Sequence, residues 1–284
     1  MAKRKRPEQL HQEDLERIKN FRLMDDDFLT KCFEGETACT QLVLRIVLEK
    51  PDLVVLEVRT QVFVSNLLKR SVRLDIVATD GEGRKINIEV QREDRGAGER
   101  RARYNASMMD STLLEKGHDF ADLPEVYVVF ITENDVIGLG EPVYHIERCI
   151  LESGGRFRDG LHILYVNGAY RDDSPIGRLM HDFSCAEPDK MYYDELAQRA
   201  RFFKESKEGV VSMCKAMEEM WDKAIGIGEK KGEKRGEKRG IVKGTRKAML
   251  DTAKRMLKDD KLPLELIAEY SGLPLEEVVK LKKA

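Results

Sequence analysis

The 284-residue sequence lacks the spacings that mark several common protein classes. Its five cysteines include no Cys-x-x-Cys pair, and its five histidines include no His-Glu-x-x-His motif, which argues against a zinc site. Scattered cysteines of this kind predict reduced thiols in a cytoplasmic protein. The phosphate-binding loop, the Gly-x-Gly-x-x-Gly fingerprint and the Gly-x-Ser-x-Gly motif are also missing. We therefore expect neither a nucleotide cofactor nor serine-hydrolase chemistry.

Long apolar runs and a strong net charge are absent too. No run can cross a bilayer, and the basic start Lys3–Arg6 is not followed by an apolar stretch, so we expect no membrane association. The net charge is only −2, so any binding of nucleic acid must depend on local patches. Charged residues make up 36% of the chain, which predicts exposed helices or tails around one main domain.

Two alternating segments, residues 71–79 and 85–91, carry the most information. The apolar positions of each segment fall on one face: Leu74, Ile76 and Ala78 in the first, and Ile86, Ile88 and Val90 in the second. Strict alternation around a glycine-containing connection predicts an antiparallel hairpin with one buried face. If the turn centres near Glu82, paired residue numbers sum to 164.

This register places Asp75 opposite Glu89 and Arg73 opposite Gln91. Opposed residues have Cβ atoms roughly 4.5–5.5 Å apart, and two carboxylates at that distance repel unless a proton or cation lies between them. The pair is therefore a candidate divalent metal site. The alternative is a solvated outer face on which Arg73 and Lys85 neutralise the acids.

The order of Asp75, a turn, Glu89-Val90-Gln91 and a helix expected over residues 97–116 resembles the PD-(D/E)XK nuclease superfamily. The closer resemblance is to its branch of recombination-promoting nucleases or putative transposases, in which Glu-x-Gln replaces the usual ending in lysine. The resemblance covers most of the chain, and the matching positions are Asp27-Phe28, Phe33, Asn66, Asp75-Ile76, Asp80-Gly81, Ile88–Gln91, Arg103-Tyr104, Ser107 and Gly117.

The resemblance implies an α/β fold with a restriction-endonuclease-like core, in which helices flank a mixed central sheet, and a C-terminal helical extension. It implies that Asp75 and Glu89 are catalytic metal ligands and that the backbone carbonyl of Val90 is a third ligand. Gln91 stands where the superfamily usually has lysine. It cannot carry a positive charge, but it can orient a water or hold a phosphate oxygen.

The implied cofactor is Mg²⁺ or Mn²⁺, because hard oxygen ligands suit these ions, and the implied partner is DNA. The superfamily often adds an acid from a preceding helix; Glu36 is the candidate here, with Glu34 and Glu49 as alternatives. The implied activity is metal-dependent DNA cleavage by water, linked to recombination or transposition. The alternative is a DNA-binding or assembly protein that keeps the fold but cuts poorly, because Gln91 replaces the lysine.

The helix expected after the hairpin has two distinct faces. Its core-facing stripe is Ala102, Ala106, Met109 and Leu113. Candidate contacts to a DNA backbone are Arg100, Arg103, Tyr104 and Ser107, and the alternative is a solvated helix face.

Three further strands are expected. The Val-rich segment 53–64 predicts a strand before the hairpin, after an apolar helix over residues 37–48. The continuous apolar run 125–132 predicts a strand buried on both faces, and residues 162–166 predict another. The expected order of elements is helix, three strands, helix and strand.

The composition changes after Asp189. Residues 191–220 predict helices, and a tetrad repeat follows, headed by Gly228, Gly232, Gly236, Gly240 and Gly244. Between residues 229 and 247, nine Lys and Arg stand against three acids. Each glycine weakens a helix by about 0.8–1 kcal/mol relative to alanine, so we expect a marginal, solvated helical spacer. A DNA-backbone contact or self-association is the alternative.

The last residues predict a small helical unit. Short helices are expected over 264–271 and 275–282, at a spacing that resembles a helix-turn-helix. The second offers few base-reading groups, so a role in packing or in a homo-oligomer is at least as well supported. The expected division is a basic flexible tail 1–20, a nuclease-like domain 21–190, an extension 191–247 and a helical unit 248–284.

Overall fold

The computed structural model describes residues 7–66, 69–92, 94–259 and 261–283. Contacts divide the chain into two compact units, residues 1–217 and 218–284. Of the expected tail, Lys3–Arg6 lies outside the described residues, whereas Pro7–Asn20 forms helix α1 rather than a flexible segment. The division into four parts stays a prediction.

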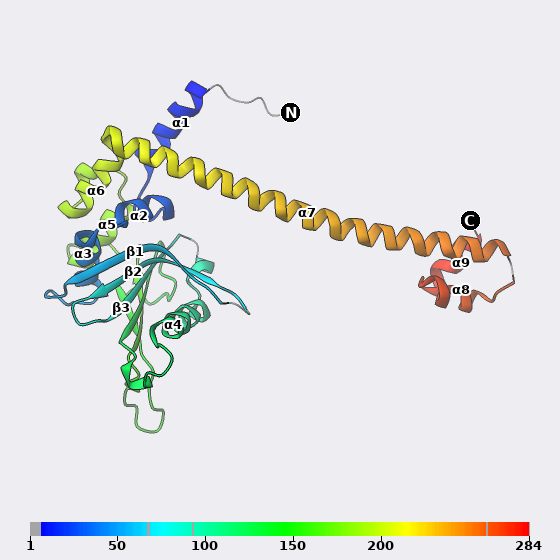
Figure 1. The fold of residues 1–284 in the computed structure, drawn as a ribbon, viewed down its shortest axis with the longest axis horizontal. Coiled ribbons are helices and arrows are strands. Elements are labelled where there is room, and N and C mark those ends of the chain that lie inside the picture. The colour runs from blue at the N-terminus through cyan, green and yellow to red at the C-terminus, as the bar shows by residue number, and fades with distance from the viewer. Residues whose placement is uncertain (1–6, 67–68, 93, 260, 284) are drawn as a thin grey trace. The chain divides into compact units, whose positions relative to one another are not determined.

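A mixed six-stranded sheet is the centre of the first unit (Figure 1). The strands lie in the order β1-β2-β3-β4-β6-β5. The β3–β4 and β4–β6 pairs are parallel, and the other three pairs are antiparallel. The strands are β1 Val55–Val64, β2 Val72–Asp80, β3 Lys85–Gln91, β4 Val126–Thr132, β5 Val143–Ile146 and β6 Leu161–Asn167.

Helices cover both faces of this sheet. One apolar cluster joins one face to α1, α2, α3, α5, α6 and the start of α7, and a second cluster joins the other face to α4. The helices are α2 Asp26–Phe33, α3 Thr37–Val47, α4 Glu99–Leu113, α5 Pro175–Ser184, α6 Asp194–Glu205 and α7 Lys207–Asp259, with short 3₁₀ turns η1 Asp94–Ala97, η2 Phe120–Asp122 and η3 Pro188–Lys190. The expected mixed sheet flanked by helices is confirmed.

The hairpin of β2 and β3 has the expected register. The recorded pairs, from Ile76 with Ile88 to Thr79 with Lys85, all sum to 164. The expectation of one buried face is wrong, because β3 is an inner strand between β2 and β4 and has helices over both faces. Every residue from Ile86 to Val90 is buried.

Alternation along β2 breaks at Asp75. Leu74 packs in the cluster under α4, whereas Ile76 packs in the opposite cluster, so the expectation that they share a face is wrong. Pairing of β1 with β2 is recorded on either side of Asp75, but not between Asp75 and Gln61. Gln61 has a φ of 52°, in the left-handed region. The sheet is therefore irregular where Asp75 lies.

The second unit has its own small core. Ala253 of α7 packs with Ile267 of α8 (Leu264–Ser271) and with Val278 of α9 (Leu275–Lys283). Gly272 ends α8 with a φ of 72°, which a glycine adopts without strain. The two short helices agree with the sequence prediction. None of the helices described here is both long and apolar enough to cross a membrane.

Candidate functional site

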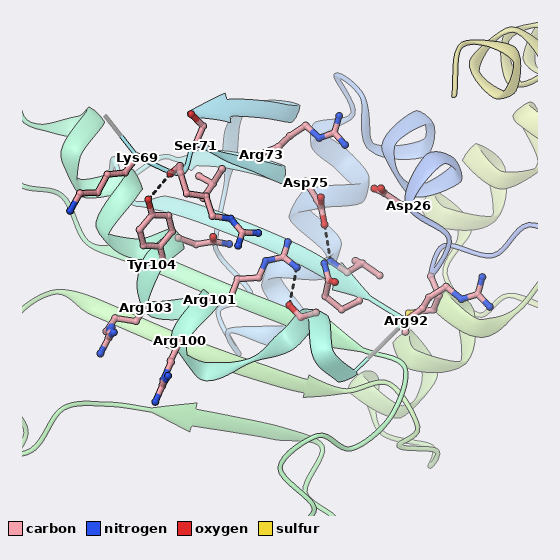
Figure 2. Close-up of a pocket in the computed structure, with 17 residues that line it drawn as sticks. Asp26, Lys69, Ser71, Arg73, Asp75, Arg92, Arg100, Arg101, Arg103 and Tyr104 are labelled. Carbon is pink, nitrogen blue, oxygen red and sulfur yellow. Dashed lines mark hydrogen bonds between the residues drawn. The ribbon is translucent and has the colours of Figure 1, made fainter. Parts of the chain in front are cut away.

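A cavity of about 1200 Å³ lies over the irregular region of the sheet (Figure 2). Its walls come from the start of α2, the loop before β2, the end of β3 with η1, and the first turns of α4. The lining residues are Met24, Asp26, Lys69, Arg70, Ser71, Val72, Arg73, Asp75, Val90, Gln91, Arg92, Gly96, Arg100, Arg101, Arg103, Tyr104 and Asn105.

This lining is strongly cationic, although the chain as a whole carries a net charge of −2. Seven lining residues are Lys or Arg, and two, Asp26 and Asp75, are acids. A concave surface with such an excess concentrates anions and suits a polyanionic ligand. The local basic patch that the sequence could not locate is thus found around Asp75.

Asp75 and Glu89 approach each other where the β2–β3 ladder ends. The backbone N–H of Asp75 donates to Glu89 Oε1 at 3.3 Å, and the N–H of Val90 donates to Asp75 Oδ2 at 3.3 Å. Asn87 Nδ2 also donates to Glu89 Oε1, at 3.2 Å. The Glu89 side chain is fully buried, and 8% of Asp75 is exposed. The sheet thus carries two buried carboxylates at neighbouring positions.

Burial disfavours the charged form of both acids. It raises the pKa of Asp75 to about 8, and the nearby carboxylates of Glu89 and Asp26 add to this effect. Burial also raises the pKa of Glu89, against the opposing influence of the Arg101 guanidinium. A cation between these acids would stabilise their ionised forms.

Asp26, an acid at the start of a helix that precedes the hairpin, lines the cavity, whereas the sequence candidate for such an acid was Glu36. It is the first residue of α2, and its Oδ1 accepts a hydrogen bond of 3.1 Å from Gln61 Nε2. Figure 2 shows its carboxylate on the same side of the cavity as that of Asp75. Glu36 instead pairs with Arg199 of α6 at 3.2 Å and does not line the cavity, so its assignment is corrected.

Arg101 of α4 is the closest charge partner of Glu89. Its Nη2 lies 2.5 Å from Glu89 Oε2, and its Nη1 donates to the Gly96 carbonyl at 2.8 Å. Its guanidinium carbon lies 5.8 Å from the centre of the Phe130 ring. Sequence reasoning missed Arg101, because helix periodicity alone does not show which arginine turns toward Glu89.

Gln91 lies at the end of β3 and packs closely over Gly96. A Cβ atom built on Gly96 would lie 2.0 Å from Gln91 Oε1, so only glycine leaves room for this side chain. The Gln91 amide can therefore occupy this position in the cavity because Gly96, in η1, has no side chain.

The candidate DNA contacts on α4 divide into two groups. Arg100, Arg103 and Tyr104 line the cavity, and the Tyr104 hydroxyl donates to the Arg70 carbonyl at 2.5 Å. Ser107 does not line it; its hydroxyl donates back to the Arg103 carbonyl at 3.0 Å. The buried Asn105 also faces the cavity, and its Nδ2 has no hydrogen-bond partner among the described residues.

The donor chemistry fits a hard divalent cation. Carboxylate and carbonyl oxygens are the ligands that Mg²⁺ and Mn²⁺ prefer. The Val90 N–H faces Asp75, and since the N–H and C=O of a strand residue point toward the same edge, its carbonyl faces that edge as well. Within the described part of the chain, no three His, Cys, Asp or Glu side chains are already gathered as a metal cluster.

Comparison with known protein families agrees with this geometry. Residues 41–171 match the model of the family described as PD-(D/E)XK nuclease family transposase. The match covers β1 to β6, including Asp75, Glu89 and the whole of α4. No curated protein and no solved structure gave a match. Residues 41–171 are therefore similar to a PD-(D/E)XK nuclease family transposase domain, and the mixed sheet with its flanking helices has a restriction-endonuclease-like α/β fold.

Proposed function

We propose that this protein is a metal-dependent endonuclease that hydrolyses phosphodiester bonds of DNA. The observation that carries the proposal is the position of two buried carboxylates, Asp75 and Glu89, beside a cavity lined by seven cations and two acids. The cations suit the phosphate backbone of DNA, and the carboxylates suit a divalent metal ion.

In this proposal Asp75, Glu89 and the Val90 carbonyl hold Mg²⁺ or Mn²⁺, and Asp26 is the additional acid. A bound ion would neutralise charge on the scissile phosphate and lower the pKa of an attacking water. Gln91 orients this water or a phosphate oxygen through its amide, because it lines the same cavity as Asp75 and Asp26.

The basic side chains of α4 bind the substrate backbone. Arg100 and Arg103 face the cavity with Tyr104, and Ser107 lies one turn after Arg103, at the edge of this surface. Asn105 offers a buried amide donor that a phosphate or base oxygen could satisfy.

The setting that we propose is recombination or transposition in the cytoplasm. Copies of the chain associate through the C-terminal helices, whose small apolar core leaves Tyr270 and Leu275 exposed. No nucleotide cofactor takes part.

The alternative is a DNA-binding protein that cuts poorly. Gln91 favours it, because an amide cannot supply the positive charge that lysine would give to the transition state. The two functions differ in their products, since only an endonuclease converts supercoiled DNA to nicked or linear forms.

Incubation of supercoiled plasmid with the full chain and Mg²⁺ or Mn²⁺ tests the proposal. We expect nicks with the wild type, and none with Asp75→Ala or Glu89→Ala at unchanged circular dichroism. Retention of DNA without nicks, with or without metal, would support the alternative. Failure to bind DNA even at low salt, where backbone contacts are strongest, would contradict both.

A further inference from the structure

Both carboxylate oxygens of Glu89 are already engaged. Oε1 accepts from the Asp75 N–H at 3.3 Å and from Asn87 Nδ2 at 3.2 Å, and Oε2 accepts from Arg101 Nη2 at 2.5 Å. The first two donors are neutral, whereas Arg101 carries a full positive charge. A divalent cation that binds Oε2 would compete with this guanidinium for the same oxygen, and the two positive charges would repel.

The position of Arg101 allows it to leave Glu89. It stands in the first turn of α4, and 37% of its side chain is exposed, whereas the Glu89 side chain is fully buried. The guanidinium lines the cavity that also contains Arg100 and Arg103. A turn away from Glu89 would therefore leave its charge within this cavity.

A second contact limits how far Arg101 can move. Its Nη1 donates to the Gly96 carbonyl at 2.8 Å, and Gly96 lies directly against the Gln91 amide. A guanidinium has five N–H donors, so Arg101 can keep the Gly96 contact and still present donors to an anion. Arg101, Gly96 and Gln91 thus form one connected edge of the site.

We propose that Arg101 is a displaceable counter-ion of Glu89. It neutralises and orients this buried carboxylate when no metal is bound, and a divalent cation displaces it from Oε2. The released guanidinium then binds a phosphate oxygen of the nucleic acid. This last step rests on the proposed endonuclease function, whereas the competition for Glu89 does not.

The chain provides a matched control on the same helix. Arg103 lies two residues after Arg101 and lines the same cavity, and the contacts of Glu89 described above do not include it. Arg101→Gln and Arg103→Gln each remove one positive charge from the cavity. Only the first removes the competitor of the metal at Glu89.

Calorimetric titration of the full chain with Mn²⁺, in the absence of DNA, separates the two variants. We expect Arg101→Gln to bind Mn²⁺ about tenfold more tightly than the wild type, the size of effect that a charge-assisted hydrogen bond gives. Arg103→Gln should bind within about twofold of the wild type, because long-range repulsion across the open cavity is screened. A purely structural Arg101 predicts weaker binding on substitution, so equal or weaker Mn²⁺ affinity of Arg101→Gln would overturn the proposal.

DNA cleavage and retention give the second readout. Arg101→Gln should cleave more slowly than the wild type at saturating Mn²⁺, despite its tighter metal binding, and Arg101→Lys should recover part of the rate. If no form of the protein cleaves DNA but Arg101→Gln binds Mn²⁺ more tightly, the endonuclease proposal fails and the counter-ion proposal holds. If the wild type cleaves DNA and Arg101→Gln binds Mn²⁺ no more tightly than the wild type, the endonuclease proposal holds and the counter-ion proposal fails.

A measurement on the wild type does not depend on the folding of any variant. Nitrogen-15 NMR can follow the Arg101 Nε–H signal while diamagnetic Mg²⁺ is added. The proposal predicts a change of this signal that saturates together with metal binding and exceeds the change at Arg103. An unchanged Arg101 signal at saturating Mg²⁺ would overturn it.

Discussion

Asp75 donates its backbone N–H to Glu89 Oε1 over 3.3 Å, beside the last recorded pair of the β2–β3 ladder, Ile76 with Ile88. A side-chain oxygen thus takes the place of a ladder partner. In the same way, the Val90 N–H donates to Asp75 Oδ2, a side-chain oxygen, instead of to a ladder partner. The strands therefore hold the two acids through neutral donors, so a counter-charge for their ionised forms comes from Arg101 or from a metal ion.

The raised pKa of Asp75 makes stability depend on pH. Burial raises this pKa from 3.8 to about 8, so the folded protein holds the Asp75 proton more tightly than the unfolded chain. The stability that this group contributes is present at low pH and falls from about pH 4 to about pH 8, by at most about 1.4 kcal/mol per pH unit. Asp75→Asn does not titrate and should gain stability relative to the wild type over this window.

Urea unfolding in EDTA between pH 4 and pH 8 measures this difference. Saturating Mg²⁺ is the control, because a bound ion favours ionised Asp75 and should reverse the trend of the wild type. A difference in unfolding free energy that stays constant with pH would show that Asp75 titrates near its ordinary value.

Substitutions of Asp26 and Glu36 test which of these acids belongs to the metal site with Asp75 and Glu89. Asp26→Asn removes a carboxylate from the cavity and should lower Mn²⁺ affinity and cleavage by about 10- to 100-fold, as loss of an outer metal-site group commonly does. Glu36→Gln removes only a partly exposed pair with Arg199 and should change neither. Titration of both variants with Mn²⁺ shows which acid contributes to metal binding. A loss of Mn²⁺ affinity in Glu36→Gln but not in Asp26→Asn would restore the assignment to Glu36.

Much of this arrangement follows from the sequence for a simple physical reason. Period-2 alternation and a short turn fix a hairpin register, and the observed pairs have the expected sum of 164. The apolar run at 125–132 likewise predicts the fully buried β4. Local patterns of this kind need no knowledge of distant residues.

Other features depend on contacts between distant segments. Asp26 is held by Gln61, 35 residues away, and Gln61 itself has a left-handed backbone that the alternating pattern does not reveal. Leu74 and Ile76 pack on opposite faces of the sheet, which strict alternation does not predict either. The four-residue strand β5 is too short to give a periodic signal. The sequence alone identifies Asp75 and Glu89 of the hairpin, whereas Asp26 and Arg101 can be identified as neighbours of these acids only from the folded structure.

The close approach of Gly96 to Gln91 predicts a sensitive glycine. A Cβ in Gly96→Ala would lie 2.0 Å from Gln91 Oε1, so the amide must move out of its place. We expect Gly96→Ala to lose cleavage to about the same extent as Gln91→Ala, with little change in melting temperature. Gly98→Ala is the control, because nothing lies within 4 Å of its Cβ position. Full activity of Gly96→Ala would show that the position of Gln91 does not matter.

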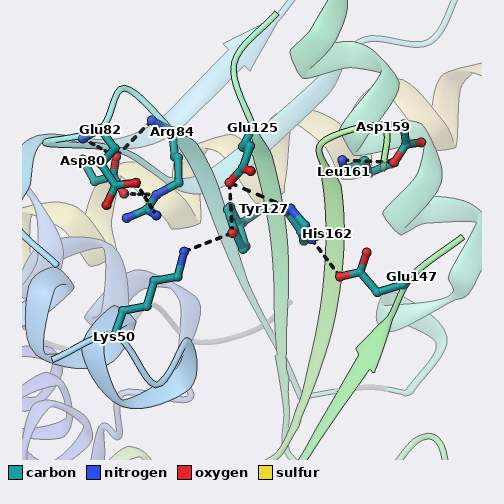
Figure 3. Close-up of polar contacts among 10 residues, drawn as sticks. All are labelled: Lys50, Asp80, Glu82, Arg84, Glu125, Tyr127, Glu147, Asp159, Leu161 and His162. Atoms are coloured by element: carbon teal, nitrogen blue, oxygen red, sulfur yellow. Dashed lines mark hydrogen bonds and ion pairs between the residues drawn. The ribbon is translucent and has the colours of Figure 1, made fainter. Parts of the chain in front are cut away.

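The turn between β2 and β3 depends on a buried ion pair (Figure 3). Asp80 is fully buried; its Oδ2 lies 2.5 Å from Arg84 Nε, and its Oδ1 accepts from the N–H of Arg84 and of Glu82, each at 3.0 Å. Arg84→Met leaves the Asp80 charge without its cation and should lower the free energy of unfolding by about 3–5 kcal/mol.

Chemical denaturation near pH 7 measures this loss. Glu82→Gln is the control, because 72% of the Glu82 side chain is exposed and its pair with Arg84 should contribute less than about 1 kcal/mol. An Arg84→Met variant as stable as Glu82→Gln would mean that the buried pair does not stabilise the hairpin.

The central claim is that Asp75 and Glu89 together hold a divalent cation. Anomalous scattering from crystals grown with Mn²⁺ tests it most directly. We predict one strong anomalous peak within about 2.5 Å of carboxylate oxygens of both residues, with the Arg101 guanidinium moved off Glu89 Oε2. A site without anomalous signal at saturating Mn²⁺, with Arg101 still on Glu89, would contradict the account.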